Sequence, residues 1–195
     1  MKDLAFELVL IGVSVFFIWR AIHRRSLGFT ALFWAGAILF AWARTYLAEQ
    51  YFRIIPLEKA MTRGSPLPLA LPLYWTCLVY ASLRFAEKIN RLDFLAGRVR
   101  SRLVLLHGVL FFILSLAIRS VFVYLEGGGR GFGWTAPIAT LQALDAFTAL
   151  FYPLFFRAVW TGRWSYGRKV AGVLLVNPLL LIVQVILYYI YGFLI

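Results

Sequence analysis

Two ionisable residues that lie inside long apolar stretches are the first candidates for chemistry. Arg119 lies within SLAIRSVFVYL, and Asp145 lies within LQALDAFTALFYP. Segment 126–135 connects the two apolar stretches that contain these residues, and each residue lies several positions away from it. We therefore expect Arg119 and Asp145 at similar depth and close enough to form a salt bridge. Charged residues at membrane depth are costly and usually functional. Three interpretations follow: a bridge that locks two helices, a role in proton transfer or substrate binding, and an Arg119 that extends to the headgroups.

The other polar residues in apolar stretches give weaker signals. Glu49 lies at the end of such a stretch. Its side chain is either solvated at a helix end or a buried acid. The two histidines, His23 and His107, lie in distant segments, so we expect no metal site. Asn177 and Gln184 are seven residues apart and share a helix face, which favours hydrogen bonds between helices. The sequence has no phosphate-binding glycine loop and no histidine set for haem, so no cofactor is predicted.

These residues are carried by segments long enough to cross a bilayer. Of 195 residues, 63% are hydrophobic and 14% are charged, whereas a soluble domain is roughly half apolar and a quarter charged. A spanning helix needs about 20 apolar residues, and no stretch shows the alternation of a membrane barrel. Six stretches qualify: 4–19, 28–48, 66–83, 103–125, 136–156 and 170–195. We therefore expect an all-α fold, a polytopic bundle of six transmembrane helices in one domain over residues 1–195.

The distribution of the +12 formal charge predicts the orientation of this bundle. The first, third and fifth connections carry thirteen basic residues: Arg20, Arg24, Arg25, Arg84, Lys88, Arg91, Arg98, Arg100, Arg102, Arg157, Arg163, Arg168 and Lys169. Six basic residues, Arg44 among them, are assigned to the opposite side. Because cytoplasmic connections are enriched in Lys and Arg, we expect both termini on the external side of a cell (inner) membrane. Short basic connections suit anionic headgroups, so membrane lipid, not nucleic acid, is the expected partner.

The segment GSPLPLALPLYWTCLVYASLRFAEKI contains a proline-leucine-x-tryptophan pattern and ends in Ala-Glu-Lys. With Pro72, Trp75 and Glu87 in these places, it resembles the carotenoid-biosynthesis membrane family that includes the bisanhydrobacterioruberin and gamma-carotene hydratases. Glu49 and the later segment GGGRGFGWTAPIATLQALDAF agree with that family in order, so the resemblance covers roughly residues 15–155. The paired aspartates that the family carries on its fourth helix are missing, because no acid occurs between Arg102 and Leu125.

The resemblance implies a hydratase-like lyase that acts on a long apolar polyene or isoprenoid lipid within the bilayer. Hydration requires protonation of a terminal double bond to a tertiary cation, followed by capture of that cation by water. Asp145 is the first candidate for the catalytic acid and Glu49 the second. The expected substrate contacts are Arg119, Tyr74, Trp75 and Thr140.

Two other functions are compatible with the same residues. The missing aspartates and a structural Arg119–Asp145 pair would suit a non-enzymatic scaffold or accessory subunit of a larger membrane complex. A small-solute transporter would need a polar pathway, and the candidates for lining it are Arg119, Asp145, Thr148, Asn177 and Gln184. The sequence is compatible with an enzyme and with a non-enzymatic protein. It is also compatible with pairing to a second copy or to another membrane protein.

Overall fold

The computed structural model describes residues 2–50, 70–96, 100–127 and 136–194, and within them the chain is helical, without strands. The helices are α1 (Lys2–Arg24), α2 (Leu27–Gln50), α4 (Ala70–Asn90), α5 (Ser101–Gly127), α6 (Ala136–Thr161) and α7 (Tyr166–Leu194). The predicted all-α fold is confirmed. Most of the helices continue past the predicted apolar limits into the charged residues that follow, because backbone hydrogen bonds along a helix do not stop at the first ionised side chain.

Local signals account for two of the helix ends. Ser26 is the N-cap of α2, where its hydroxyl accepts a hydrogen bond of 3.1 Å from the backbone N–H of Phe29. After α4, Arg91 has a left-handed backbone with φ of 51°. The backbone N–H of Leu92 donates back to the carbonyl of Glu87 at 3.0 Å. This arrangement ends a helix while satisfying one of its last carbonyls.

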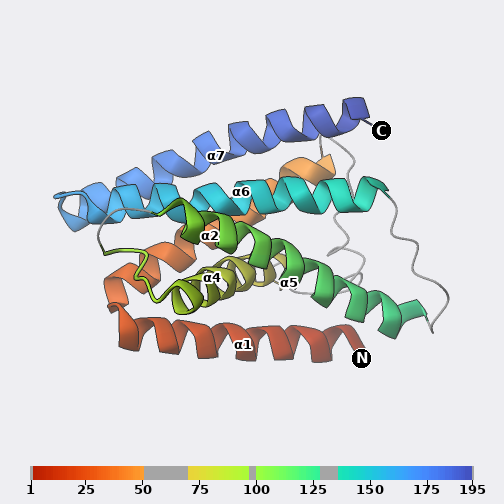
Figure 1. Ribbon diagram of the computed structural model, residues 1–195, viewed down its shortest axis with the longest axis horizontal. Coiled ribbons are helices and arrows are strands. Elements are labelled where there is room, and N and C mark those ends of the chain that lie inside the picture. The colour runs from red at the N-terminus through yellow and green to blue at the C-terminus, as the bar shows by residue number, and fades with distance from the viewer. Residues whose placement is uncertain (1, 51–69, 97–99, 128–135, 195) are drawn as a thin grey trace.

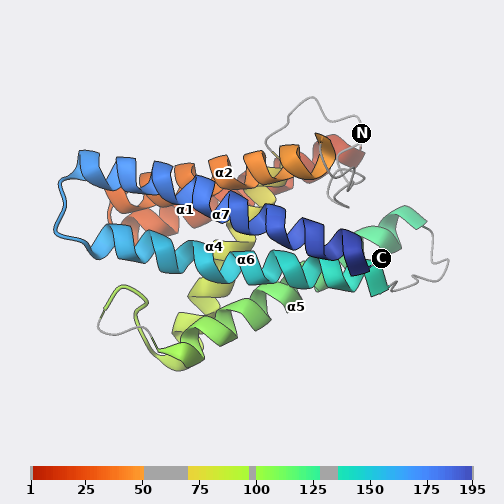
Figure 2. The same cartoon turned by 90° about the horizontal axis from the view of Figure 1, so that it is seen from above.

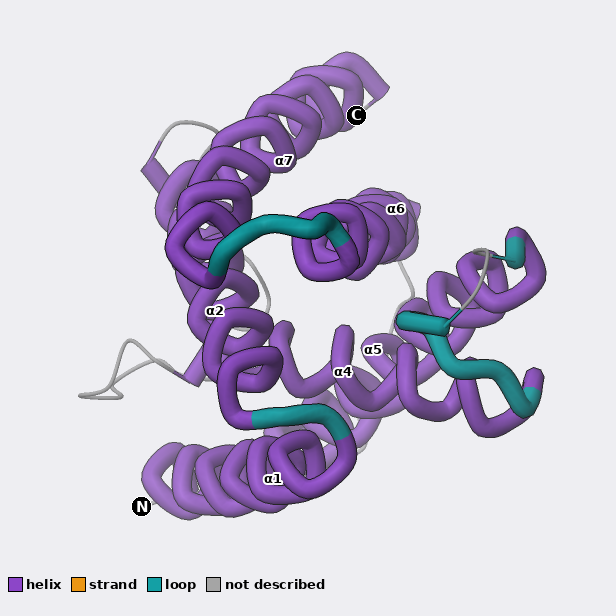
Figure 3. Tube along the Cα trace, turned by 90° about the vertical axis from the view of Figure 1, so that its left-hand side faces the viewer, coloured by secondary structure: helices purple, strands orange, loops and turns teal. Residues whose placement is uncertain are grey.

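Helix α4 lies at the centre of the bundle and crosses it obliquely (Figure 2). It packs against α5, α2 and α1, while α2 also packs against α7, and α6 against both α5 and α7. All residues from 74 to 80 are buried, which means that every side of α4 is covered over two turns. Figure 3, seen along the bundle, shows α2 between α1 and α7.

Three helices are long and apolar enough to cross a membrane, over Leu27–Leu47, Ser101–Ile118 and Tyr166–Ile190. Only 22% of the α7 segment is buried in the isolated chain, and large apolar side chains such as Leu175 and Ile182 lie on its surface. A surface of this kind is stable in contact with acyl chains. Six spans are predicted from the sequence, and among the described residues three helices meet this criterion.

Both ends of the described chain lie at the same end of the bundle. The first turn of α1 and the last turn of α7 are on the right of Figure 1, and the connections from α1 to α2, α4 to α5 and α6 to α7 are on the left. The left end carries the basic residues of the first, third and fifth connections that the structure describes. We call it the arginine-rich end.

Candidate functional site

Asp145, the first candidate acid, lies in α6 and is 5% exposed. Its Oδ1 accepts a hydrogen bond from Nη1 of Arg44 on α2, and the two form an ion pair. In the sequence, Arg44 counts only as one of six basic residues opposite the basic connections, whereas in the structure Arg44 is buried, at 4% exposed. Arg44 lies on the side of α2 that faces the bundle interior. There the carboxylate of Asp145 offsets the cost of burying the guanidinium.

Two of the expected substrate contacts, Tyr74 and Trp75, belong to the buried part of α4. The guanidinium carbon of Arg44 lies 5.8 Å from the centre of the Trp75 ring, as in a cation–π contact. Trp75 also packs its ring against Phe40 and Tyr152. The structure thus brings Asp145 and Trp75 to the same buried cation, and both already have partners inside the fold.

Three other predicted site residues have side chains outside the described part of the chain. Arg119 lies on α5, Glu49 on α2 and Thr140 on α6. The Arg119–Asp145 pair and the roles assigned to Glu49 and Thr140 therefore stay predictions.

Several other buried polar side chains join helices to one another. The Thr148 hydroxyl donates to Oε1 of Gln184, and Nδ2 of Asn177 donates to the Gly36 carbonyl at 3.0 Å. These bonds link α6 to α7 and α7 to α2, as predicted for Asn177 and Gln184. His107 on α5 lies 2.9 Å from the Ser82 hydroxyl on α4 and 3.0 Å from the Ala149 carbonyl on α6. Each bond satisfies a polar group that lipid could not.

A cavity of about 520 Å³ lies at the arginine-rich end, between α1 and α4. Its cationic residues are Arg20, Arg24, Arg25, Arg84 and Lys88. Its aromatic residues are Phe16, Phe17, Tyr80 and Phe85. The volume falls within the range of small-molecule sites, roughly 300–1,000 Å³.

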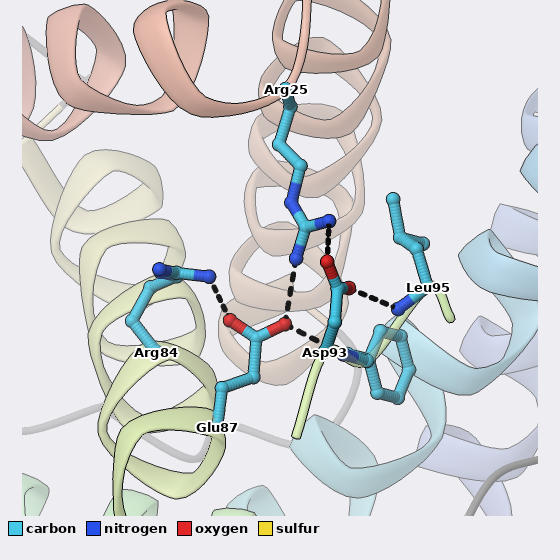
Figure 4. A network of polar contacts seen from close by, with 6 residues as sticks. Arg25, Arg84, Glu87, Asp93 and Leu95 are labelled. Carbon is cyan, nitrogen blue, oxygen red and sulfur yellow. Dashed lines mark hydrogen bonds and ion pairs between the residues drawn. The ribbon is translucent and has the colours of Figure 1, made fainter. Parts of the chain in front are cut away.

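Glu87 organises the polar side of this cavity (Figure 4). Its carboxylate is 5% exposed and accepts hydrogen bonds from Arg84 and, at 2.8 Å, from Nη2 of Arg25. The backbone N–H of Phe94 donates to the same carboxylate at 2.8 Å. Nη1 of Arg25 reaches Asp93 at 2.6 Å. One arginine from the α1–α2 connection is thereby tied to α4 and to the segment that follows it.

The charges in this network stabilise one another. Partial burial acts to lower the pKa of Arg25, but its hydrogen bond to Asp93 and the nearby charges of Glu87 and Asp93 prevail, and the pKa lies above its ordinary value. Partial burial acts to raise the pKa of Asp93. The hydrogen bonds from Arg25 and from the Leu95 backbone prevail there, and the pKa of Asp93 lies below its ordinary value. Both groups are therefore charged at neutral pH.

The other cations of the cavity stand in two pairs. Arg20 and Arg24 are one turn apart on α1, and Arg84 and Lys88 are one turn apart on α4. No ion pair within the described residues involves Arg20, Arg24 or Lys88. Like charges one turn apart repel each other, so an anion bound between the two helices would relieve this repulsion.

No family model, curated protein or solved structure matches this chain. The assignment of function therefore rests on the geometry described above.

The sequence contains a signal for this cavity that a count of basic residues does not reveal. Such a count treats the first and third connections separately, whereas in the fold their cations face one another across the cavity. Glu87 and Asp93 are the acids of the third connection, and an acid amid so many cations indicates a specific ion pair. The sequence also contains a signal for the burial of Arg44, because this arginine lies inside the apolar stretch 28–48, four residues before its end.

Proposed function

We propose that this chain is a multi-pass protein of the cell (inner) membrane that binds an amphipathic lipid in the cavity between α1 and α4. In this proposal all six helices cross the bilayer, both termini are external, and the arginine-rich end faces the cytoplasm. The lipid headgroup lies against the cations of the cavity, and its acyl or isoprenoid chain lies along the aromatic side chains.

The order of side chains along α1 is the observation that carries this proposal. Phe16, Arg20 and Arg24 follow one another at single-turn spacing and all line the cavity. The aromatic residue is farther from the helix end than the two cations are. The cavity is thus apolar toward the bilayer interior and cationic toward the membrane surface, which is the polarity of an anionic lipid. Phe16 and Phe85 are exposed in the isolated chain, so the aromatic side is open to lipid.

The test compares lipid retention by the full chain and by a cavity variant. We expect the wild-type protein, purified in mild detergent, to carry bound anionic lipid that native mass spectrometry detects. Arg20→Gln with Lys88→Gln should weaken lipid binding about a hundredfold, since each of the two charge-assisted contacts contributes roughly a factor of ten. Arg163→Gln changes an exposed arginine outside the cavity and serves as the control. Equal occupancy in all three proteins would contradict the proposal.

A second candidate function is hydration of a polyene or isoprenoid chain with Asp145 as the acid. The observation in its favour is the placement of Asp145 near the buried aromatic ring of Trp75, since such rings stabilise carbocations. The bond from Arg44 occupies one oxygen of this acid in the resting fold. If this function is correct, pigment or polyprenol co-purifies with the protein, and Asp145→Asn abolishes its turnover. Unchanged turnover in that variant would exclude Asp145 as the acid.

A further inference from the structure

The number of unneutralised charges in the cavity indicates which kind of headgroup it takes. Five cations and two carboxylates line it, which leaves three positive charges in excess. Both carboxylates are already engaged by Arg25 and Arg84. The excess therefore resides on the side chains without such a partner: Arg20 and Arg24 on α1, and Lys88 on α4.

We propose that the cavity is selective for a headgroup that ends in a phosphomonoester or diphosphate, over the phosphodiester of ordinary membrane phospholipids. This inference rests on the proposed lipid-binding function and specifies its ligand. A phosphodiester carries a single negative charge and leaves most of the excess unbalanced. A phosphomonoester carries about two near neutral pH, and a diphosphate carries more.

The geometry of the cations suits a terminal phosphate. Arg20 and Arg24 line the cavity from α1 and Lys88 lines it from α4, so both helices offer cations to a bound group. A terminal phosphate offers three oxygens to such donors, and a guanidinium binds two oxygens of one phosphate in parallel. A phosphodiester offers two unesterified oxygens and is esterified on both sides, so it suits contact from one side better.

Glu87 and Asp93 orient the remaining arginine of the cavity, Arg25. The two nitrogens of Arg25 are directed to two different carboxylates, at 2.8 and 2.6 Å. Because these carboxylates belong to α4 and to the segment after it, they hold the connection between α1 and α2 beside the cavity. Glu87 is thus a positioning residue, and the cations of α1 and α4 make the contacts with phosphate.

The experiment measures competition between headgroups on the full chain in detergent micelles. Short-chain phosphatidic acid, phosphatidylglycerol and phosphatidylcholine are supplied together, and bound species are counted by native mass spectrometry. We expect phosphatidic acid to bind at least about tenfold more tightly than phosphatidylglycerol, because it gains a further charge-assisted contact. In Arg20→Gln with Arg24→Gln this ratio should fall toward one, while Arg168→Gln, an exposed arginine outside the cavity, should preserve it.

A second arm separates a lipid phosphate from a free one. Farnesyl diphosphate and inorganic pyrophosphate are titrated into the same protein. Tighter binding of farnesyl diphosphate supports both proposals, because the aromatic side of the cavity then contributes. Equal binding supports the charge selectivity and contradicts the lipid-binding function.

The remaining outcomes also separate the two proposals. Phosphatidylglycerol that binds as tightly as phosphatidic acid, with both lost in the cavity variant, overturns the headgroup selectivity and leaves lipid binding intact. Binding that no cavity variant changes overturns both.

Discussion

At the scale of single residues, the contrast between Glu87 and Asp93 shows how burial sets the value of an ion pair. Both carboxylates bind Arg25, but the side chain of Glu87 is 5% exposed and that of Asp93 is 46% exposed. Water screens the exposed pair, whereas the buried carboxylate depends on its protein partners. The two residues therefore form a matched pair for mutation.

We expect Glu87→Gln to lower the free energy of unfolding by about 2 kcal/mol, because two guanidinium groups lose the negative charge of their shared acceptor and one of its two oxygens. Asp93→Asn should cost less than about 1 kcal/mol, as exposed pairs do. Denaturant titration in detergent, followed by tryptophan fluorescence, measures both values. Equal losses would show that burial does not separate the two carboxylates.

The Asp93 carboxylate should also give stability a pH dependence. Its pKa in the folded protein is lowered, so folding favours the ionised form and the contribution is complete above the pKa of the unfolded chain, about 4. The contribution disappears as pH falls through the lower pKa of the folded state. The difference in unfolding midpoint between wild type and Asp93→Asn should therefore be constant from pH 7 to 5 and shrink below pH 4. A difference that grows on acidification would contradict the assignment.

The Arg44–Asp145 pair should behave as a unit in a double-mutant cycle. Arg44→Met or Asp145→Leu alone removes one charge of a buried ion pair and should cost about 3 kcal/mol. The double variant removes both charges and should cost clearly less than either single variant. Resistance to unfolding in sodium dodecyl sulfate gives the three values. Losses that simply add would show that the two side chains do not depend on each other.

At the scale of elements, close packing of α2 against α6 and α7 depends on one glycine. A Cβ atom at Gly36 would lie 2.6 Å from Cγ1 of Val173 and 2.7 Å from the hydroxyl oxygen of Tyr152. That hydroxyl donates to the Phe33 carbonyl at 2.8 Å, and Asn177 donates to the carbonyl of Gly36 itself. The crossing is thus held by hydrogen bonds that only a short helix–helix distance permits.

Gly36→Ala should therefore destabilise the fold by about 1–3 kcal/mol, since the added methyl forces α6 and α7 away from α2. Gly12→Ala on α1 is the control, because nothing lies within 4 Å of a Cβ atom there. The control should be neutral or slightly stabilising. Thermal aggregation of the two variants in detergent measures the difference, and equal midpoints would contradict the close approach at Gly36.

At the scale of the whole molecule, both ends of the described chain lie opposite the arginine-rich end. If the bundle axis crosses the bilayer, as in the proposed function, this arrangement implies an even number of crossings between the first turn of α1 and the last turn of α7. Six crossings with the basic connections inside satisfy both this arrangement and the rule for positive charge.

Cysteine labelling in intact cells tests this topology. Cys77 is buried and is replaced by serine to leave a silent background. In that background, Ser165→Cys places a thiol in the α6–α7 connection, and Lys2→Cys places one in the first turn of α1. We expect a membrane-impermeant maleimide to label position 2 in intact cells and position 165 only after permeabilisation. Labelling of position 165 in intact cells would reverse the proposed orientation.

The helices were predictable from sequence because their cause is local. A segment such as 170–195 satisfies its own backbone hydrogen bonds and is apolar along its length, so no knowledge of its neighbours is needed to expect a helix. The interhelical roles of Asn177 and Gln184 were predictable for the same reason, because an amide in an apolar helix must find a partner. Their particular partners were not.

Pairing between helices depends on rotation and crossing, and these are properties of the assembled bundle. Asp145 forms an ion pair with Arg44, which lies 101 residues away along the chain, and nothing in the order of the sequence indicates this partner. The cavity likewise joins α1 to α4, which the chain separates by α2 and the segment after it. Hydropathy and charge are sums along one segment, and the sequence contains them directly. A site formed by two segments exists only once packing has decided which faces meet.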